Sequence, residues 1–138
     1  MAAPIYPIQD GVLRDRLYAV ADEFLRALNR RDARELRADF GIGAELLREI
    51  DEELAWLSKD GKAPALQMPP RPLAYVWARG RWPFDASPMH QPGEPPCYAV
   101  HSQIWIDGQA TEETLIVDIK PRPHPGRWEF RFRLIEVM

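Results

Sequence analysis

Residues 98–108 have the sequence Tyr-Ala-Val-His-Ser-Gln-Ile-Trp-Ile-Asp-Gly. A row of mainly apolar side chains occupies every second position from residue 98 to residue 106. Alternation with a period of two predicts a β-strand that buries one face. Asp107-Gly108 is a common hairpin turn pair. The stretch therefore predicts a strand that turns back into an antiparallel neighbour.

Two further alternating segments follow this strand. One spans residues 115–119, and the other begins after a Pro-rich turn over residues 121–126. Because parallel neighbours need a connection of a dozen or more residues, this spacing predicts an antiparallel meander over residues 98–138. The row predicted to face the core contains Tyr98, Val100, Ile104, Ile106, Leu115, Val117, Ile119, Trp128, Phe130, Phe132 and Leu134.

Residues 1–62 are predicted to form a helical layer. Apolar residues recur at helical spacing from about Asp10 to Asn29, which predicts a long amphipathic helix. Asp32 followed by Glu35 has the form of a capping box and predicts a second, short helix. A third helix, with one apolar face, is predicted to end by Gly61.

Residues 63–97 are rich in proline and are predicted to connect the helices to the meander. Within them, Leu73 to Arg79 is predicted to be the first strand, and Pro83 to Pro96 a long loop. The whole chain is thus expected to be one α+β domain, with about three helices on one face of a curved, mainly antiparallel sheet of about four strands.

Composition excludes several classes of protein. The chain has 138 residues, of which 46% are hydrophobic, and its formal net charge is −3. This charge argues against nucleic-acid binding, which needs clustered cations. The single cysteine favours a reducing compartment, the N-terminus lacks the pattern of a signal peptide, and no apolar run reaches the roughly 20 residues that cross a bilayer. We expect a cytoplasmic protein that does not enter membranes.

The opposite row of the sheet suggests a binding surface. Trp105, Ile116 and Ile135 are apolar residues on a face that normally meets water. Aromatic residues and arginine are enriched at protein interfaces. The residues predicted to form such a surface are Tyr75, Trp77, Arg79, Arg81, Trp105, Arg131 and Arg133. A mixed solvent face, or a face covered by the Pro-rich loop, is the alternative.

Residues 24–36, Phe-Leu-Arg-Ala-Leu-Asn-Arg-Arg-Asp-Ala-Arg-Glu-Leu, resemble the opening of nuclear transport factor 2-like domains. In that superfamily, which includes ketosteroid isomerases, a long first helix steps into a short second one. The C-terminal meander also resembles the family's curved sheet, and the resemblance implies a cone with a pocket between helices and sheet. The family usually has strands between its second and third helices, whereas only residues 40–43 stand there in this chain, which leaves a cystatin-like sheet as an alternative. Residues 76–85 resemble a segment of small bacterial domains, which implies no activity.

No set of residues predicts a particular chemistry. His90, Cys97, His101 and His124 do not have the spacing of a zinc site, and Cys97 and His101 would lie about 13 Å apart on a strand. We therefore predict no metal, no cofactor and no catalytic residue. Arg79 and Arg81, beside Trp77 and Trp82, form a candidate anion site, with a solvated turn as the alternative.

Two functional hypotheses follow. The preferred one is a non-enzymatic interaction module, of the immunity or accessory type, that binds a protein partner or forms a homodimer. The acidic run Glu49, Asp51, Glu52 and Glu53 and the outer sheet row favour it. The alternative is an isomerase-like or hydratase-like enzyme that binds a small molecule in the cone. Tyr18, Asp39, Tyr98 and Ser102 would line its pocket, although no inward Asp or Glu is predicted there.

Overall fold

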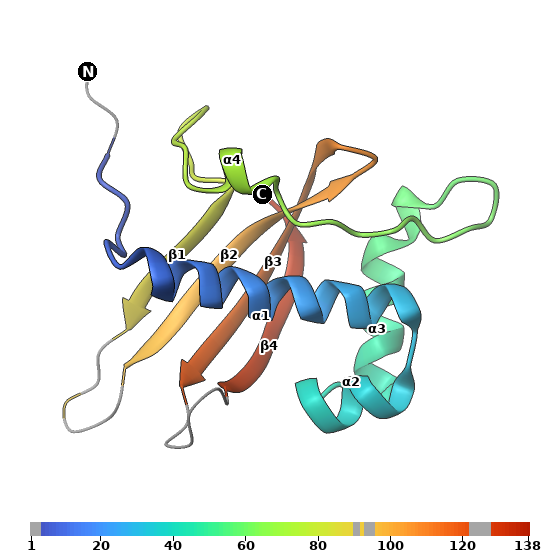
Figure 1. Ribbon diagram of the computed structural model, residues 1–138. Helices are drawn as coiled ribbons and strands as arrows, with labels where there is room; N and C mark the ends of the chain where they lie inside the picture. The colour runs from blue at the N-terminus through green and yellow to red at the C-terminus, as the bar shows by residue number, and fades with distance from the viewer. Residues whose placement is uncertain (1–3, 90–91, 93–95, 122–127) are drawn as a thin grey trace.

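The computed structural model describes residues 4–89, 92, 96–121 and 128–138. Helices come first and a four-stranded antiparallel sheet of order β1-β2-β3-β4 comes after them, which confirms the predicted α+β class. The elements are α1 (Gly11–Arg30), α2 (Ala33–Phe40), α3 (Ala44–Leu54), η1 (Ala55–Leu57), α4 (Arg71–Ala74), β1 (Phe84–Met89), β2 (Cys97–Ile106), β3 (Gln109–Pro121) and β4 (Trp128–Val137). In Figure 1, α1 crosses one face of the sheet, and α2 and α3 lie toward the β4 side.

The helix starts follow from their capping residues. The Asp10 side chain accepts the backbone N–H groups of Val12 and Leu13, and the Asp32 side chain accepts those of Arg34 and Glu35. Such acceptors satisfy N–H groups that have no partner inside the helix. The predicted starts of the first two helices are therefore confirmed. None of the helices in the described ranges is long and apolar enough to span a bilayer.

The prediction for the first strand is wrong. Residues 71–74 form α4 instead, with a proline in its first turn, where a missing N–H loses no helical bond. Ala78 then pairs with Arg81 across a tight turn. The first strand is β1, which lies inside the stretch predicted to be a loop. β1 is an edge strand, and an edge strand tolerates a residue such as Pro88 that cannot donate a hydrogen bond.

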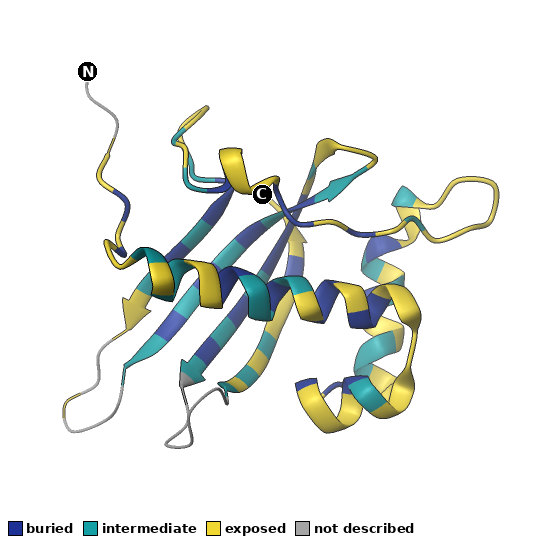
Figure 2. Ribbon diagram, in the orientation of Figure 1, coloured by how far each residue is buried: buried dark blue, intermediate teal, exposed yellow. Residues whose placement is uncertain are grey.

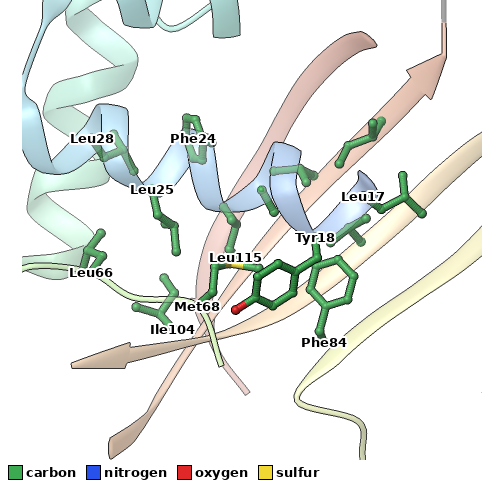
Figure 3. Close-up of a cluster of buried hydrophobic side chains, with 14 of the residues drawn as sticks. Leu17, Tyr18, Phe24, Leu25, Leu28, Leu66, Met68, Phe84, Ile104 and Leu115 are labelled. Carbon is green, nitrogen blue, oxygen red and sulfur yellow. The ribbon is translucent and has the colours of Figure 1, made fainter. Parts of the chain in front are cut away.

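The core lies between α1 and the inner face of the sheet. Along α1, the side that faces the sheet is buried and the opposite side is exposed (Figure 2). Figure 3 shows the α1 side chains of Leu17, Phe24 and Leu25 among those of Ile104 and Leu115, and all of these are at most 1% exposed. Fully burying one such side chain contributes about 1.5–3 kcal/mol. This layer is the main source of stability.

Strand β4 contains an irregularity that changes which residues face the core. Val117 pairs with Phe132, but its neighbour Ile116 pairs with Leu134, so Arg133 is an extra residue on β4. An extra residue reverses the alternation beyond it. Leu134, predicted to face inward, is 39% exposed, and Ile135, predicted to face outward, is 7% exposed. Both predictions are wrong for this reason.

The predicted inner row before this bulge is correct. The Phe24 ring of α1 lies 4.7 Å from the Phe130 ring and 5.8 Å from the Phe132 ring, measured between centroids. Phe40 of α2 contacts Phe130 edge-on at 5.1 Å. The aromatic residues of β4 thus join both helices to the sheet.

Candidate interaction surface on the outer sheet face

The face of the sheet opposite α1 carries side chains in cross-strand rows, which the strand register defines. From β1 to β4, the first row is Asp85, His101, Ile116 and Leu134. The second row is Ser87, Ala99, Asp118 and Arg131, and the third is Met89, Cys97, Lys120 and Glu129. Every one of these residues is half-buried or exposed, although their inner-face neighbours on β2 and β3 are almost fully buried. No helix within the described ranges covers this outer face.

Charged groups of both signs lie near the apolar pair Ile116 and Leu134 on the outer face. Arg133 forms a 2.9 Å ion pair with Asp118, whose side chain is 14% exposed. Burial raises the pKa of Asp85, while the nearby charges of His101 and Arg81 act in the opposite direction. Ile116 and Leu134, which are paired across β3 and β4, lie between these groups. The apolar pair therefore has charged neighbours, and Leu134 lies at the open β4 edge of the face.

Beyond the first row, the outer face is covered where Arg81 contacts Thr114 of β3. Its Nη2 donates to Oγ1 of Thr114 at 3.3 Å, and Thr114 is fully buried. Thr114 pairs with Gln103 on β2, and Gln103 accepts the indole N–H of Trp105 at 3.1 Å. Trp105 is on the outer face as predicted, but the Arg81 contact lies between it and Ile116. Trp105 is therefore at the margin of the face.

Two of the predicted surface residues lie elsewhere. The Tyr75 ring packs edge-on against Tyr6 at 5.2 Å, and its hydroxyl donates to Asp15 of α1 at 3.2 Å. Trp77 packs against Trp82 at 4.8 Å, next to the same Tyr6 ring. Both belong to an aromatic cluster beside the start of β1. They were expected on the outer face because a strand was predicted where a short helix and a turn occur.

The two arginines of the candidate anion site have different environments. Arg79 is exposed at the turn, with a φ of 54°, and Arg81 is directed to Thr114 on β3. Among the described residues, the structure gives them no common hydrogen-bond partner. Arg131 and Arg133, in contrast, both lie on the β4 side of the outer face.

The four residues predicted to line a pocket do not meet in one. The Tyr18 hydroxyl donates to the backbone oxygen of Pro69 at 2.6 Å, and the Ser102 hydroxyl contacts the Met68 sulfur at 3.8 Å. Figure 3 shows Tyr18 close to Met68 and Phe84 within the packed core. Asp39 is exposed on α2, and Tyr98 lies four residues from Ser102 along β2.

A hollow of about 360 Å³ lies elsewhere, between α1, α3 and the connector. Asn29, on its wall, exchanges hydrogen bonds with the backbone of Leu66 at 2.8 Å, and Arg31 is paired with Asp51. Asn29, Arg31 and Asp51 therefore already have partners within the fold. Its lining residues are Leu28, Asn29, Arg31, Ile50, Asp51, Leu54, Ala55, Ser58, Gly61, Ala63, Pro64, Ala65 and Leu66.

Two of the four residues considered as metal ligands lie within the described part of the chain. His90 and His124 lie outside the described residues. Cys97 and His101 share the outer face of β2, four residues apart. Burial, followed by the negative charge of Asp118, raises the pKa of the Cys97 thiol. A raised pKa keeps a thiol protonated, which lowers its reactivity.

Sequence reasoning missed one buried acid. Glu113 of β3 is fully buried, and its Oε1 accepts the indole N–H of Trp56 at 2.7 Å. It stands beside Glu112 in a polar stretch after the hairpin turn, where a solvent-facing side chain is the ordinary expectation. Only its pairing with β4 and the contact with η1 reveal its burial.

Comparison of the chain with family models, with curated proteins and with solved structures gives no match. The resemblance to nuclear transport factor 2-like domains therefore stays a prediction from residues 24–36 and from the meander.

Proposed function

We propose that this protein is a non-enzymatic interaction module that self-associates through the outer face of its sheet. The observation that carries the proposal is the apolar pair Ile116 and Leu134, side by side on β3 and the edge strand β4, on a face that no described helix covers. A role of the immunity or accessory type would suit such a module.

The composition of the face supports this proposal. Stable interfaces combine less polar residues with a polar rim. The three cross-strand rows extend over all four strands, whose neighbours lie about 4.8 Å apart. Ala99, in the second row, has a short side chain and leaves room for a second sheet to approach.

The charge distribution supports a second copy of this chain as the partner. Asp85 lies on β1, at one side of the face, and Arg131 lies on β4, at the other side. Two-fold symmetry makes such an interface isologous. Suppose that the two-fold axis of the dimer lies midway between two facing sheets and runs parallel to their strands. β1 of each copy then lies over β4 of the other copy. Asp85 would then lie over Leu134 of the second copy, in the same row, and Arg131 of the second copy would lie one row away, about 7 Å along the strand.

The enzyme hypothesis has weaker support. It needs an open cavity with a polar group between α1 and the sheet, and that space is occupied by closely packed apolar side chains (Figure 3). The hollow beside α3 contains Asp51, but this carboxylate is paired with Arg31. Neither region offers a free acid or base to a substrate.

The test is a single charge placed on the apolar pair. Leu134→Glu puts a carboxylate at an exposed position of an edge strand, so the fold should survive while the apolar pair is lost. We expect sedimentation velocity to show dimer for the wild type at high protein concentration and monomer for Leu134→Glu. Val12→Glu is the matched control, because Val12 is 65% exposed on α1, away from this face.

Two outcomes would contradict the proposal. One is a wild-type protein that stays monomeric up to near-millimolar concentration. The other is equal loss of the dimer in Val12→Glu and Leu134→Glu, which would place the contact elsewhere or make it non-specific.

A further inference from the structure

The helices α2 and α3, which are joined by residues 41–43 alone (Figure 1), form the walls of a hollow of about 460 Å³. Three arginines line it, Arg34 and Arg37 from α2 and Arg48 from α3. Its floor is apolar, because Ile42 is only 2% exposed and Leu47 is half-buried there. The hollow therefore combines a cationic wall with an apolar floor.

The three arginines lack an acid partner. All five ion pairs found among the described residues involve other arginines. Asp51 is the acid in the lining of this hollow, and its carboxylate is paired with Arg31, which is not part of that lining. The hollow thus has an excess of positive charge in a chain whose formal net charge is −3. Positive charges held close together repel one another, and a bound anion would remove that repulsion.

The N-terminus of α3 lies at the same hollow. The first backbone N–H groups of a helix have no partner inside it, and they carry the positive end of the helix dipole. At α3 the N-cap residue is Gly43, and no side chain caps these N–H groups. Nη2 of Arg37 lies 3.7 Å from the place that a Cβ on Gly43 would occupy. The hollow therefore brings a guanidinium group beside backbone donors.

We propose that this hollow binds the phosphate group of a small phosphate monoester, whose apolar part lies on Ile42 and Leu47. A phosphate monoester carries close to two negative charges at neutral pH and has three strong acceptor oxygens. Arginines donate paired N–H groups to such oxygens, and a helix N-terminus supplies further donors. A carboxylate, with one charge and two oxygens, would use fewer of these donors.

A soluble ligand fits the hollow better than a lipid head group on a membrane. Proteins that bind at a membrane surface insert exposed apolar side chains beside their cations. The apolar residues of this hollow lie on its floor, and the large apolar side chains exposed elsewhere in the described ranges are not part of its lining. All three arginines are exposed, so a dissolved anion can reach them. The inference is independent of the proposed dimer, because the hollow belongs to the helical layer.

An NMR titration of the backbone amides with phenyl phosphate at neutral pH tests the site. We expect saturable shifts centred on residues 43–48, and weaker binding both of benzoate, which has one charge, and of inorganic phosphate, which lacks the ring. Arg37→Gln and Arg48→Gln should each weaken binding about tenfold, since each removes a charge-assisted contact. Arg16→Gln, which removes the same charge from an exposed position of α1, should change the affinity less than about twofold.

Gly43→Asp separates binding from stability. The backbone at Gly43, with a φ of −84° and a ψ of 174°, suits a capping aspartate, whose carboxylate would accept first-turn N–H groups and place a negative charge beside Arg37. We therefore expect a higher Tm together with a loss of phenyl phosphate binding of at least about tenfold. Loss of binding in a more stable protein cannot be caused by unfolding.

Several results would overturn the proposal. Wild-type shifts that do not saturate by about 10 mM phenyl phosphate would show that no specific site exists. Benzoate that binds as tightly as phenyl phosphate would contradict a phosphate site, and equal weakening by Arg16→Gln and Arg37→Gln would indicate non-specific attraction. Undiminished binding in Gly43→Asp would place the anion elsewhere. Tighter binding to phosphatidic acid vesicles than to phenyl phosphate would mean that the ligand is a membrane surface.

Discussion

At the scale of single residues, the hydroxyl group of Tyr6 illustrates how one side chain can close the edge of a sheet. It donates to the backbone oxygen of Phe84 at 2.5 Å and accepts the backbone N–H of Ala86 at 3.0 Å. Both backbone groups belong to the edge of β1 that has no neighbouring strand. Unpaired backbone N–H and C=O groups at a sheet edge can pair with another chain, and the Tyr6 hydroxyl forms hydrogen bonds with two of these groups.

Tyr6→Phe should therefore destabilise the protein more than Tyr18→Phe. Removing the Tyr6 hydroxyl leaves a buried donor and a buried acceptor unsatisfied, which costs about 1–3 kcal/mol. Tyr18 makes a single hydrogen bond, to the Pro69 backbone oxygen, so its loss should cost about 1 kcal/mol. Urea denaturation of both variants gives the comparison. Equal midpoints for the two would mean that Tyr6 does not secure the edge of β1.

Individual residues differ in how well the sequence predicts their roles. Asp10 and Asp32 could be assigned as helix caps, because a cap depends only on residues two and three positions further along the chain. The role of Glu113 depends on Trp56, which is 57 residues away, and on pairing with β4. No local pattern contains that information.

At the scale of elements, the bulge in β4 decides which side chains stabilise the core. Before the bulge, Phe130 and Phe132 pack against Phe24, and beyond it Ile135 replaces Leu134 on the inner face. The extra residue, Arg133, gains an ion pair with Asp118 on the outer face. The bulge thus provides both a core residue and a charged group on the outer rim.

Alanine substitutions at the two neighbouring positions test this register. Ile135→Ala should lower the free energy of unfolding by about 2–3 kcal/mol, because it removes buried methyl groups. Leu134→Ala should change it by less than about 1 kcal/mol, as is usual for an exposed position. Chemical denaturation at low protein concentration measures both. The opposite order would show that the strand alternates without a bulge.

Elements with regular periodicity could be predicted, and elements that depend on their position in the sheet could not. Alternation predicts β2, β3 and most of β4. The sequence predicts a loop where β1 forms, because β1 contains Pro88 and proline is rare in strands other than edge strands. The sequence pattern does not tell which strand lies at an edge. The place of β1 at the sheet edge, next to β2, makes that proline acceptable. The bulge escaped prediction because the adjacent apolar residues Leu134 and Ile135 do not by themselves tell which of the two faces the core.

At the scale of the whole molecule, the two faces of the sheet differ in what covers them. The inner face and α1 bury most of the large apolar side chains, and the space between them is filled. The outer face holds residues of mixed character that no described helix covers. The face has Asp85 on β1 and both Arg131 and Glu129 on β4, and the proposed dimer brings Asp85 of one copy near Arg131 of the other.

The layered class of the fold could be predicted, because helical periodicity ends before strand periodicity begins. The outer face could be predicted only in part. The residues that lie on it as expected are Trp105, Ile116, Arg131 and Arg133. Tyr75 and Trp77 belong instead to the cluster around Tyr6. The order of the rows across the face follows only from the strand register. Register depends on pairing between distant segments, so a single strand pattern does not contain it.

A charge exchange across the proposed dimer tests the central claim most directly. Sedimentation equilibrium of the wild type, Asp85→Arg, Arg131→Asp and the double variant compares four dimer affinities, with circular dichroism melts to check folding. We expect each single variant to dimerise several-fold more weakly, because like charges then face each other at both symmetric positions, and the double variant to recover most of the loss. A double variant weaker than both single ones, or a wild type that remains monomeric, would contradict self-association through this face.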